Sequence, residues 1–341
     1  MSVLLRRTGK AGRITLDRPQ ALNALTHDMV LRIDAALDDW EGDPGVEVVV
    51  LDGAGTRGLC AGGDIRAIRE SALADGSAAR AFWRDEYHLN ARIAGLRKPW
   101  VALMDGIVMG GGVGLSAHGS VRIVTERSRV AMPEVGIGFV PDVGGTYLLS
   151  RAPGELGTHL ALTATAMTAG DALLCGFADH YVPSDRLPAL LEALSTRGAE
   201  AVEAFAEPAP PAPLAERRGW IDACYAADTV EEVVDRLTGS AEPAAKEAAS
   251  VLLGHSPTAL KVTLASLRRA RGLRSVGRVL AQEWCVSLAA LSWPDLAEGV
   301  RAQVVDKDRQ PRWSPPLLAE VPDRTVADAF LEPAEGPLCG R

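Results

Sequence analysis

The chain of 341 residues is long enough for one large domain or two small ones with a sizeable core. Hydrophobic residues make up 47% and charged residues 23%, a composition typical of globular proteins that excludes a disordered, collagen-like or coiled-coil chain. The 44 acidic and 36 basic residues give a net charge of −8, and no dense basic run occurs, so no nucleic-acid partner is expected.

The first half of the chain alternates strand-like and helix-like segments. Apolar runs between turn residues predict a hairpin formed by strands at residues 2–7 and 12–16, and further strands at residues 47–51, 100–104, 121–124 and 129–131. Helices are predicted at residues 26–40, with Thr26 as N-cap, over the polar sequence that ends at about Leu96, and at residues 110–118. This order of strand and helix predicts an α/β fold with covered parallel strands.

The second half is predicted to be mostly helical after a short strand-like segment at residues 179–182. Residues 207–213 form a proline-rich run, which is typical of a stiff, extended connector. Beyond it, helical patterns cover residues 214–253, 257–272 and 275–291. The expected organisation is a core over residues 1–206, the connector over 207–213, a helical region over 214–331 and a flexible tail over 332–341.

Cysteine usage and the N-terminus predict a cytoplasmic protein. The five cysteines form no C-x-x-C motif and no cluster with metal-ligand spacing; they are Cys60, Cys175, Cys224, Cys285 and Cys339. The first apolar stretch is too short for a secretory signal, and the longest uncharged run, residues 106–121, is too short to span a membrane.

The 34 glycines gather in three clusters, at residues 53–64, 106–114 and 136–145. The first two lie between an apolar strand and a helical stretch, where free backbone N–H groups face whatever binds there. Such geometry suits phosphate binding, an oxyanion hole or ordinary tight turns. The G-x-x-x-x-G-K-[ST] motif is absent, no well-placed G-x-G-x-x-G occurs, and Ser116 lacks the full G-x-S-x-G context of a nucleophile.

The motifs in and around these clusters resemble those of the crotonase (enoyl-CoA hydratase/isomerase) superfamily, and within it the 3-hydroxyisobutyryl-CoA hydrolase branch. The resemblance is strong over residues 16–182 and weaker beyond. It implies an α/β crotonase (ClpP-like) spiral of ββα units with a helical C-terminal region. The motifs are Asp17-Arg-Pro-Gln-Ala-Leu-Asn-Ala-Leu25, Leu59-Cys-Ala-Gly-Gly-Asp-Ile65, Arg84-Asp-Glu-Tyr-His-Leu-Asn90, Lys98-Pro-Trp-Val-Ala-Leu103, Met109-Gly-Gly-Gly-Val-Gly-Leu115, Ala131-Met-Pro-Glu-Val-Gly-Ile-Gly138, Pro141-Asp-Val-Gly-Gly145, Asp306-Lys-Asp308 and Pro311-Arg-Trp313.

This resemblance implies an acyl-CoA substrate whose thioester carbonyl binds two backbone amides, those of Gly63 and Gly111. Gly111 would open a helix aimed at the carbonyl oxygen, and the glycines at 110–112 support a helix start there independently. Removing one such donor typically costs about 3–4 kcal/mol of transition-state stabilisation. The substrate-binding residues implied by the resemblance are Glu86, Gly111, Glu134 and Asp142.

The carboxylates indicate which reaction to expect. Hydratases of the superfamily carry one glutamate in the helix after the glycine triplet, where this chain has Gly114, and a second where it has Glu134. Syn hydration needs a paired acid and base, so the loss of one carboxylate argues against it. The hydrolase branch instead has an aspartate eight residues beyond the glutamate, and Asp142 stands there. The expected reaction is hydrolysis of a short branched 3-hydroxyacyl-CoA, 3-hydroxyisobutyryl-CoA of valine breakdown.

Two mechanisms remain open. Glu134 either attacks the thioester carbonyl to form a mixed anhydride or activates water directly, while Asp142 orients or protonates and Glu86 helps to hold the polar end of the acyl group. Ordinary roles also remain: Glu134 capping its turn or pairing with an arginine, Asp142 as a helix N-cap, and Glu86 on a solvated helix face. Asp64 is expected to secure its own loop.

Three other functions stay open beside hydrolysis. They are another crotonase reaction such as hydration or isomerisation of a different acyl-CoA, non-catalytic CoA-thioester binding, and nucleotide binding, which the missing fingerprint disfavours. No metal or redox cofactor is expected, because CoA is part of the substrate, and no membrane partner is expected. The resemblance implies a homo-oligomer, a trimer or hexamer. The CoA phosphates would need local arginines, lysines or helix ends on this acidic chain.

Overall fold

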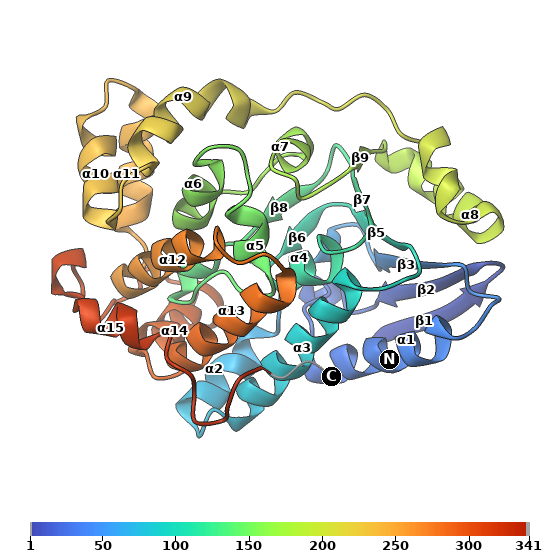
Figure 1. Ribbon diagram of the computed structural model, residues 1–341, viewed down its shortest axis with the longest axis horizontal. Coiled ribbons are helices and arrows are strands. Elements are labelled where there is room, and N and C mark those ends of the chain that lie inside the picture. Colours follow the sequence, from blue (N-terminus) through green and yellow to red (C-terminus); the bar gives the residue numbers. More distant parts are fainter. Residues whose placement is uncertain (1, 339–341) are drawn as a thin grey trace. The chain divides into compact units, whose positions relative to one another are not determined.

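A computed structural model describes residues 2–338 of the chain (Figure 1). The chain divides into two compact units, each built from three segments. Unit 1 consists of Met1–Asp64, Asp85–Ala131 and Met167–Pro213, and unit 2 of Ile65–Arg84, Met132–Ala166 and Leu214–Arg341. Cys339 and the end of the predicted tail over 332–341 lie outside the described residues.

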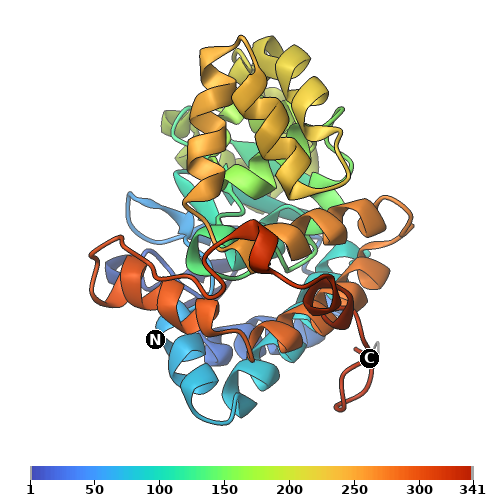
Figure 2. The same ribbon diagram turned by 90° about the vertical axis from the view of Figure 1, so that its left-hand side faces the viewer.

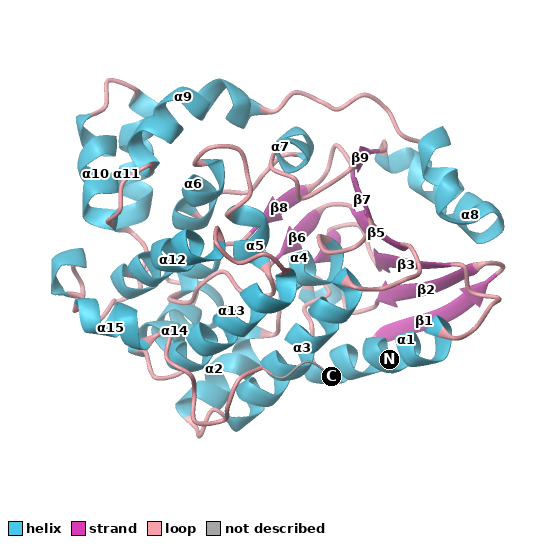
Figure 3. Ribbon diagram, viewed as in Figure 1, coloured by secondary structure: helices cyan, strands magenta, loops and turns pink. Residues whose placement is uncertain are grey.

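Unit 1 contains two β-sheets, drawn in magenta in Figure 3. The larger sheet has the strand order β1-β2-β3-β5-β7-β9, in which only the β1–β2 pair is antiparallel. Its strands are β1 (Val3–Thr8), β2 (Ala11–Leu16), β3 (Val48–Gly53), β5 (Trp100–Met104), β7 (Val121–Val124) and β9 (His180–Tyr181). The predicted hairpin and parallel strands are therefore confirmed, and the near-complete burial of β3 and β5 is typical of a covered parallel sheet.

The smaller sheet positions the glycine clusters. Its parallel strands are β4 (Gly58–Cys60), β6 (Ile107–Met109) and β8 (Arg129–Ala131). The first two were not predicted, because three-residue strands next to glycines carry no detectable periodicity. Since the carboxyl ends of parallel strands meet at one edge of a sheet, the chain leaves β4 and β6 on the same side.

Helices cover the large sheet of unit 1. The first is α1 (His27–Glu41), where the Thr26 side chain accepts a hydrogen bond from Met29 N, as predicted. Leu190 and Leu194 of α8 (Leu187–Arg197) pack into the buried cluster formed with the sheet. The remaining helices here are α4 (Gly111–Ser116), α7 (Ala169–Leu174) and the second part of α3 (Ser77–Ala94).

In the described part of unit 2, all regular secondary structure is helical. Its helices are α2 (Ile65–Leu73), the first part of α3, α5 (Gly145–Leu149), α6 (Leu156–Thr163), α9 (Pro213–Tyr225), α10 (Val230–Gly239), α11 (Pro243–Leu253), α12 (Pro257–Ala270), α13 (Val276–Ala290), α14 (Pro294–Val300) and α15 (Asp323–Asp328). The predicted helical segment over residues 214–253 consists of three helices, because the Thr229 cap and Pro243 each start a new one. Figure 2 shows α10 and α11 side by side.

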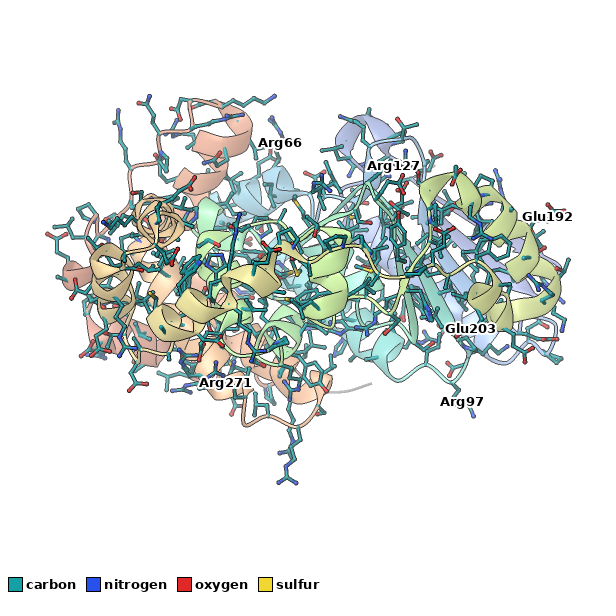
Figure 4. The ribbon with its side chains drawn as sticks, turned by 90° about the horizontal axis from the view of Figure 1, so that it is seen from above. Arg66, Arg97, Arg127, Glu192, Glu203 and Arg271 are labelled. Carbon is teal, nitrogen blue, oxygen red and sulfur yellow. The ribbon has the colours of Figure 1, made fainter. Side chains whose placement is uncertain are left out.

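Charged side chains lie mainly on the outside of each unit. Arg97, Glu192 and Glu203 of unit 1, labelled in Figure 4, are exposed and point outward. Over residues 2–338, no helix is long and apolar enough to cross a membrane.

Candidate active site

The two glycine loops of unit 1 meet at the start of α4. Gly110 has φ 49° and ψ −121°, a conformation that favours glycine, and Gly111 is the first residue of the helix. The Gly111 N–H therefore has no acceptor within α4. A methyl group added at Gly111 would lie 3.4 Å from Gly63 N, so the structure brings the two predicted amide donors together.

The loop that carries Gly63 is held by backbone hydrogen bonds. Leu25 N donates to Gly62 O at 2.8 Å, and Asp64 N donates to Leu25 O at 2.8 Å. The Asp64 carboxylate also pairs with Arg18 at 3.1 Å, in agreement with the expectation that Asp64 secures its own loop. These contacts of the neighbouring residues Gly62 and Asp64 hold the backbone on both sides of Gly63 in place.

Glu86 stands beside this pair of amides. It lies on α3, is only 2% exposed, and its Oε1 would be 2.5 Å from a methyl group added at Gly111. The alternative that Glu86 occupies a solvated helix face is therefore wrong. Unit 1 thus combines three of the predicted site residues: Gly63, Gly111 and Glu86.

Asn90 is a residue of this region to which the sequence analysis gave no role. It lies one helical turn beyond Glu86 on α3, so the two side chains share a face of the helix. Asn90 is fully buried, and neither its amide nitrogen nor its amide oxygen has a hydrogen-bond partner among the described residues. Because an unsatisfied buried amide is costly, such a group is typical of a ligand-binding or water-binding site.

The first predicted carboxylate of unit 2 is also buried. Glu134 is 6% exposed and begins a short 3-10 helix, Glu134–Ile137, which ends at Gly138 with φ 71°. Phe139 N donates to Glu134 O at 3.0 Å, and the Phe139 ring stacks on Trp83 at 5.1 Å between ring centres. Backbone bonds and an aromatic stack therefore hold the segment that carries Glu134.

Asp142 lies in a strained loop of the same unit. Its side chain is 5% exposed, and the next residue, Val143, has φ 52°, which a β-branched residue rarely adopts. The N-cap of α5 is Gly144, not Asp142, so the alternative role of Asp142 as a helix N-cap is wrong.

Glu283 is a second residue that the sequence analysis missed. It lies on α13, is 1% exposed, and accepts hydrogen bonds from Gly144 N and Thr146 N of the Asp142 loop. Burial, together with the nearby Asp142 carboxylate, raises the pKa of Glu283 to about 8, although the hydrogen bonds from Thr146 and Gly144 act in the opposite direction. The sequence feature that could have identified Glu283 is an acidic residue among apolar ones on a predicted helix, next to Trp284 and near Leu280.

The two units supply groups of different chemistry, backbone amides in unit 1 and carboxyl side chains in unit 2. The backbone amides at Gly63 and Gly111 are suited to stabilise negative charge on a carbonyl oxygen, and the carboxylates of Glu134 and Asp142 are suited to nucleophilic or acid–base work. The four described cysteines are free thiols. Within residues 2–338, no group of three or more His, Cys, Asp or Glu side chains is arranged to hold a metal ion.

Comparison with known proteins gives consistent results along the whole chain. The model of the enoyl-CoA hydratase/isomerase family matches residues 11–330. The chain is 42% identical over 340 residues to the mitochondrial 3-hydroxyisobutyryl-CoA hydrolase of Rattus norvegicus and 41% identical over 340 residues to that of Homo sapiens, covering 96% of this chain and 88% of each relative.

Two solved structures are similar over nearly their full lengths. A carnitinyl-CoA dehydratase from Mycobacterium thermoresistibile superposes with a TM-score of 0.96 at 52% identity and covers 98% of both chains. An enoyl-CoA hydratase from Rhodobacter sphaeroides 2.4.1 superposes with a TM-score of 0.92 at 44% identity and covers 99% of this chain and 100% of that one. These similar proteins are thus named for three different reactions on acyl-CoA compounds: hydrolysis, dehydration and hydration.

Replacing Gly111 by alanine tests the pair of amides. The added methyl group meets the Glu86 carboxylate and Leu25, so Gly111→Ala is expected to displace Glu86 and obstruct the space before the Gly63 N–H. We expect kcat/KM for CoA release from an acyl-CoA to fall by about 10²–10³, as when an oxyanion donor is lost. Gly219→Ala on the exposed face of α9, where a methyl group meets nothing within 4 Å, is the control. An unchanged kcat/KM in folded Gly111→Ala would contradict the assignment.

Proposed function

The chain belongs to the enoyl-CoA hydratase/isomerase family, the crotonase superfamily, and we propose that it is an acyl-CoA thioester hydrolase that converts 3-hydroxyisobutyryl-CoA to 3-hydroxyisobutyrate and CoA. The observation that carries this proposal is the pair of buried carboxylates Glu134 and Asp142, with Gly114 in place of the first acid of a hydratase. The 3-hydroxyisobutyryl-CoA hydrolase relatives support the substrate. Its product would belong to valine breakdown.

In this proposal the amides of Gly63 and Gly111 form the oxyanion hole. As a nucleophile adds to the thioester carbonyl, negative charge moves onto the carbonyl oxygen, and two N–H groups fixed by backbone structure stabilise it. Both donors precede or begin a helix, which adds partial positive charge at the same place. No metal or redox cofactor is required for this step, since CoA is itself part of the substrate.

Glu134 is proposed to start the reaction in one of two ways. As a nucleophile, its carboxylate oxygen bonds to the carbonyl carbon, the C–S bond breaks, CoA leaves as a thiolate that takes up a proton, and water then opens the mixed anhydride. As a general base, Glu134 removes a proton from the water that attacks the same carbon. Asp142 orients the substrate hydroxyl or supplies the proton to the leaving thiolate.

Dehydration or hydration of an acyl-CoA is the second candidate, because two structures with these names are similar to this chain over almost all of it. Either reaction needs an acid and a base at adjacent carbon atoms. The described α4 has the sequence Gly-Gly-Val-Gly-Leu-Ser, without an acidic residue. Hydrolysis is therefore the better supported reaction.

A panel of acyl-CoA thioesters separates these reactions. We expect 3-hydroxyisobutyryl-CoA to release free CoA, and Glu134→Gln and Asp142→Asn to lower kcat by at least about 10²-fold, because each removes a group acting on the reacting atoms. Glu203→Gln, on the surface of unit 1, should leave kcat unchanged. Formation of an enoyl-CoA without free CoA would contradict hydrolysis. Binding of the thioester without any product would instead favour a non-catalytic CoA-thioester-binding protein.

Isotope incorporation distinguishes the two mechanisms. In a single turnover in oxygen-18 water, the covalent route leaves oxygen-18 in the Glu134 carboxylate when water opens the anhydride at the glutamyl carbon. The direct route leaves all the label in the released acid. Mass spectrometry of the peptide that contains Glu134 measures the outcome: label in the peptide supports nucleophilic attack, and an unlabelled peptide would contradict an anhydride that opens at the glutamyl carbon.

Glu86 and Asn90 are proposed to bind the polar end of the acyl group. Both are buried on one face of α3, and Glu86 lies beside Gly111. A hydroxyl group can donate to the carboxylate and accept from the amide, which matches the chemistry of a 3-hydroxyacyl chain.

Asn90→Leu tests this part of the proposal. The leucine has a similar size and removes a buried amide that has no partner among the described residues, so Tm is expected to stay the same or rise. Meanwhile the ratio of kcat/KM for 3-hydroxyisobutyryl-CoA to that for isobutyryl-CoA should fall by at least about tenfold, because the hydroxyl contact is lost. An unchanged ratio would remove Asn90 from substrate recognition.

Location and assembly stay predictions. A cytoplasmic protein is expected from the cysteine set and the N-terminal sequence, whereas the names of the animal relatives include the word mitochondrial. A trimeric or hexameric homo-oligomer is expected from the superfamily. Acyl-CoA is the proposed small-molecule partner.

A further inference from the structure

We propose that Glu283 is a positioning residue for Asp142, whose loop it holds in one strained conformation. The inference rests on the proposed catalytic role of Asp142. It concerns a residue on α13, more than 130 positions later in the chain, and all the contacts that support it lie within unit 2.

The loop that carries Asp142 does not have a conformation that its own residues favour. Val143 has φ 52° and Gly144 has φ 77°. Glycine tolerates this region, but a β-branched side chain is strained there and persists only where the surrounding structure imposes the conformation. The helix that follows, α5, starts from Gly144, which has no side chain to cap it.

Glu283 provides the missing cap from a distance. Its Oε2 accepts from Gly144 N at 2.6 Å, and its Oε1 accepts from Thr146 N at 3.0 Å and from Thr146 Oγ1 at 2.6 Å. Such hydrogen bonds satisfy backbone N–H groups at the start of a helix, which have no acceptor within the helix. The three hydrogen bonds come from Gly144 and Thr146, one and three residues after Val143, and hold the strained turn in its conformation.

A second contact fixes the loop from the side of Glu134. A methyl group added at Gly145 would lie 2.5 Å from Met132 Cε, so the backbone of Gly145 packs directly on the Met132 thioether. Met132 precedes Glu134 by two residues. The Asp142 loop is therefore fixed between the Glu134 segment and Glu283.

The electrostatics agree with this arrangement. The Asp142 carboxylate is close enough to Glu283 to contribute to its raised pKa, after burial as the larger cause. Arg84 on α3 is a charged group that packs against α13, with its guanidinium 5.4 Å from the centre of the Trp284 ring. A buried carboxyl group is costly to remove from water, and the three hydrogen bonds that Glu283 accepts from the residues after Val143 offset part of this cost.

A double-mutant cycle tests the proposal. Glu283→Gln keeps the size of the side chain but replaces one of its two oxygens by an NH₂ group. The variant can therefore no longer accept hydrogen bonds from both Gly144 and Thr146 with separate oxygens. We expect kcat for CoA release from 3-hydroxyisobutyryl-CoA to fall about 10–100-fold with KM within about twofold, because Asp142 is misplaced. In an Asp142→Asn background, where the positioned group is already lost, the same change should alter kcat by less than about twofold.

Glu155→Gln is the matched control. Glu155 is another buried carboxylate of unit 2 near a helix start, and it binds Thr158, Arg268 and Arg271. Its replacement should lower Tm without changing kcat. If Glu283→Gln leaves kcat unchanged, or if its effect multiplies fully with that of Asp142→Asn, Glu283 has no positioning role and the proposal is overturned.

Two further results keep the outcome clear. If Glu283→Gln does not fold, a pair of Thr146 variants replaces it: Thr146→Val removes one of the three hydrogen bonds, and Thr146→Ser keeps it. A loss of kcat in Thr146→Val that Thr146→Ser does not show supports the proposal. Equal kcat in the two variants overturns it. Wild-type activity in Asp142→Asn would instead refute the proposed function of Asp142 itself, whatever Glu283→Gln does.

Discussion

The close approach of α4 to the loop after β4 is the constraint on which the rest of unit 1 depends. There is no room for a side chain at Gly111, beside Glu86 and Leu25, or at Gly112, where a methyl group would lie 2.5 Å from Cys60 O. The parallel pairing of β4 with β6 brings the two loops to this distance. Because the donors are backbone N–H groups carried by paired strands, their geometry is set before a ligand arrives.

Buried carboxyl groups are the common feature of the proposed functional residues in unit 2. Glu134, Asp142 and Glu283 are all removed from solvent in unit 2, although the chain already carries a net charge of −8. Burial raises the pKa of Glu283 to about 8, and the start of α5 supplies this carboxyl group with three hydrogen bonds. Glycine-containing turns lie close to both proposed catalytic carboxyl groups: Gly138 ends the short helix that Glu134 begins, and Gly144 lies between Asp142 and α5.

Much of this arrangement was predictable from sequence because it is local. The hairpin, α1 with its Thr26 cap, and the strands β3 and β5 follow from apolar periodicity and turn residues. The glycine clusters also identified both amide-bearing loops, since a helix start after a strand requires little more than glycine and an apolar continuation. The three-residue strands β4 and β6 were missed because they lie within the glycine clusters, where no apolar run between turn residues marks a strand.

The sequence by itself determined the family, the parallel α/β core of unit 1, and the identities of Gly63, Gly111, Glu86, Glu134 and Asp142 as site candidates. Only the tertiary structure decided that Glu86 is buried beside Gly111, that the Asn90 amide has no hydrogen-bond partner among residues 2–338, and that Glu283 caps a helix far from it in sequence. The physical reason is the same in each case. Burial and hydrogen bonding between distant segments depend on how helices pack, and no local pattern of residues encodes the partner.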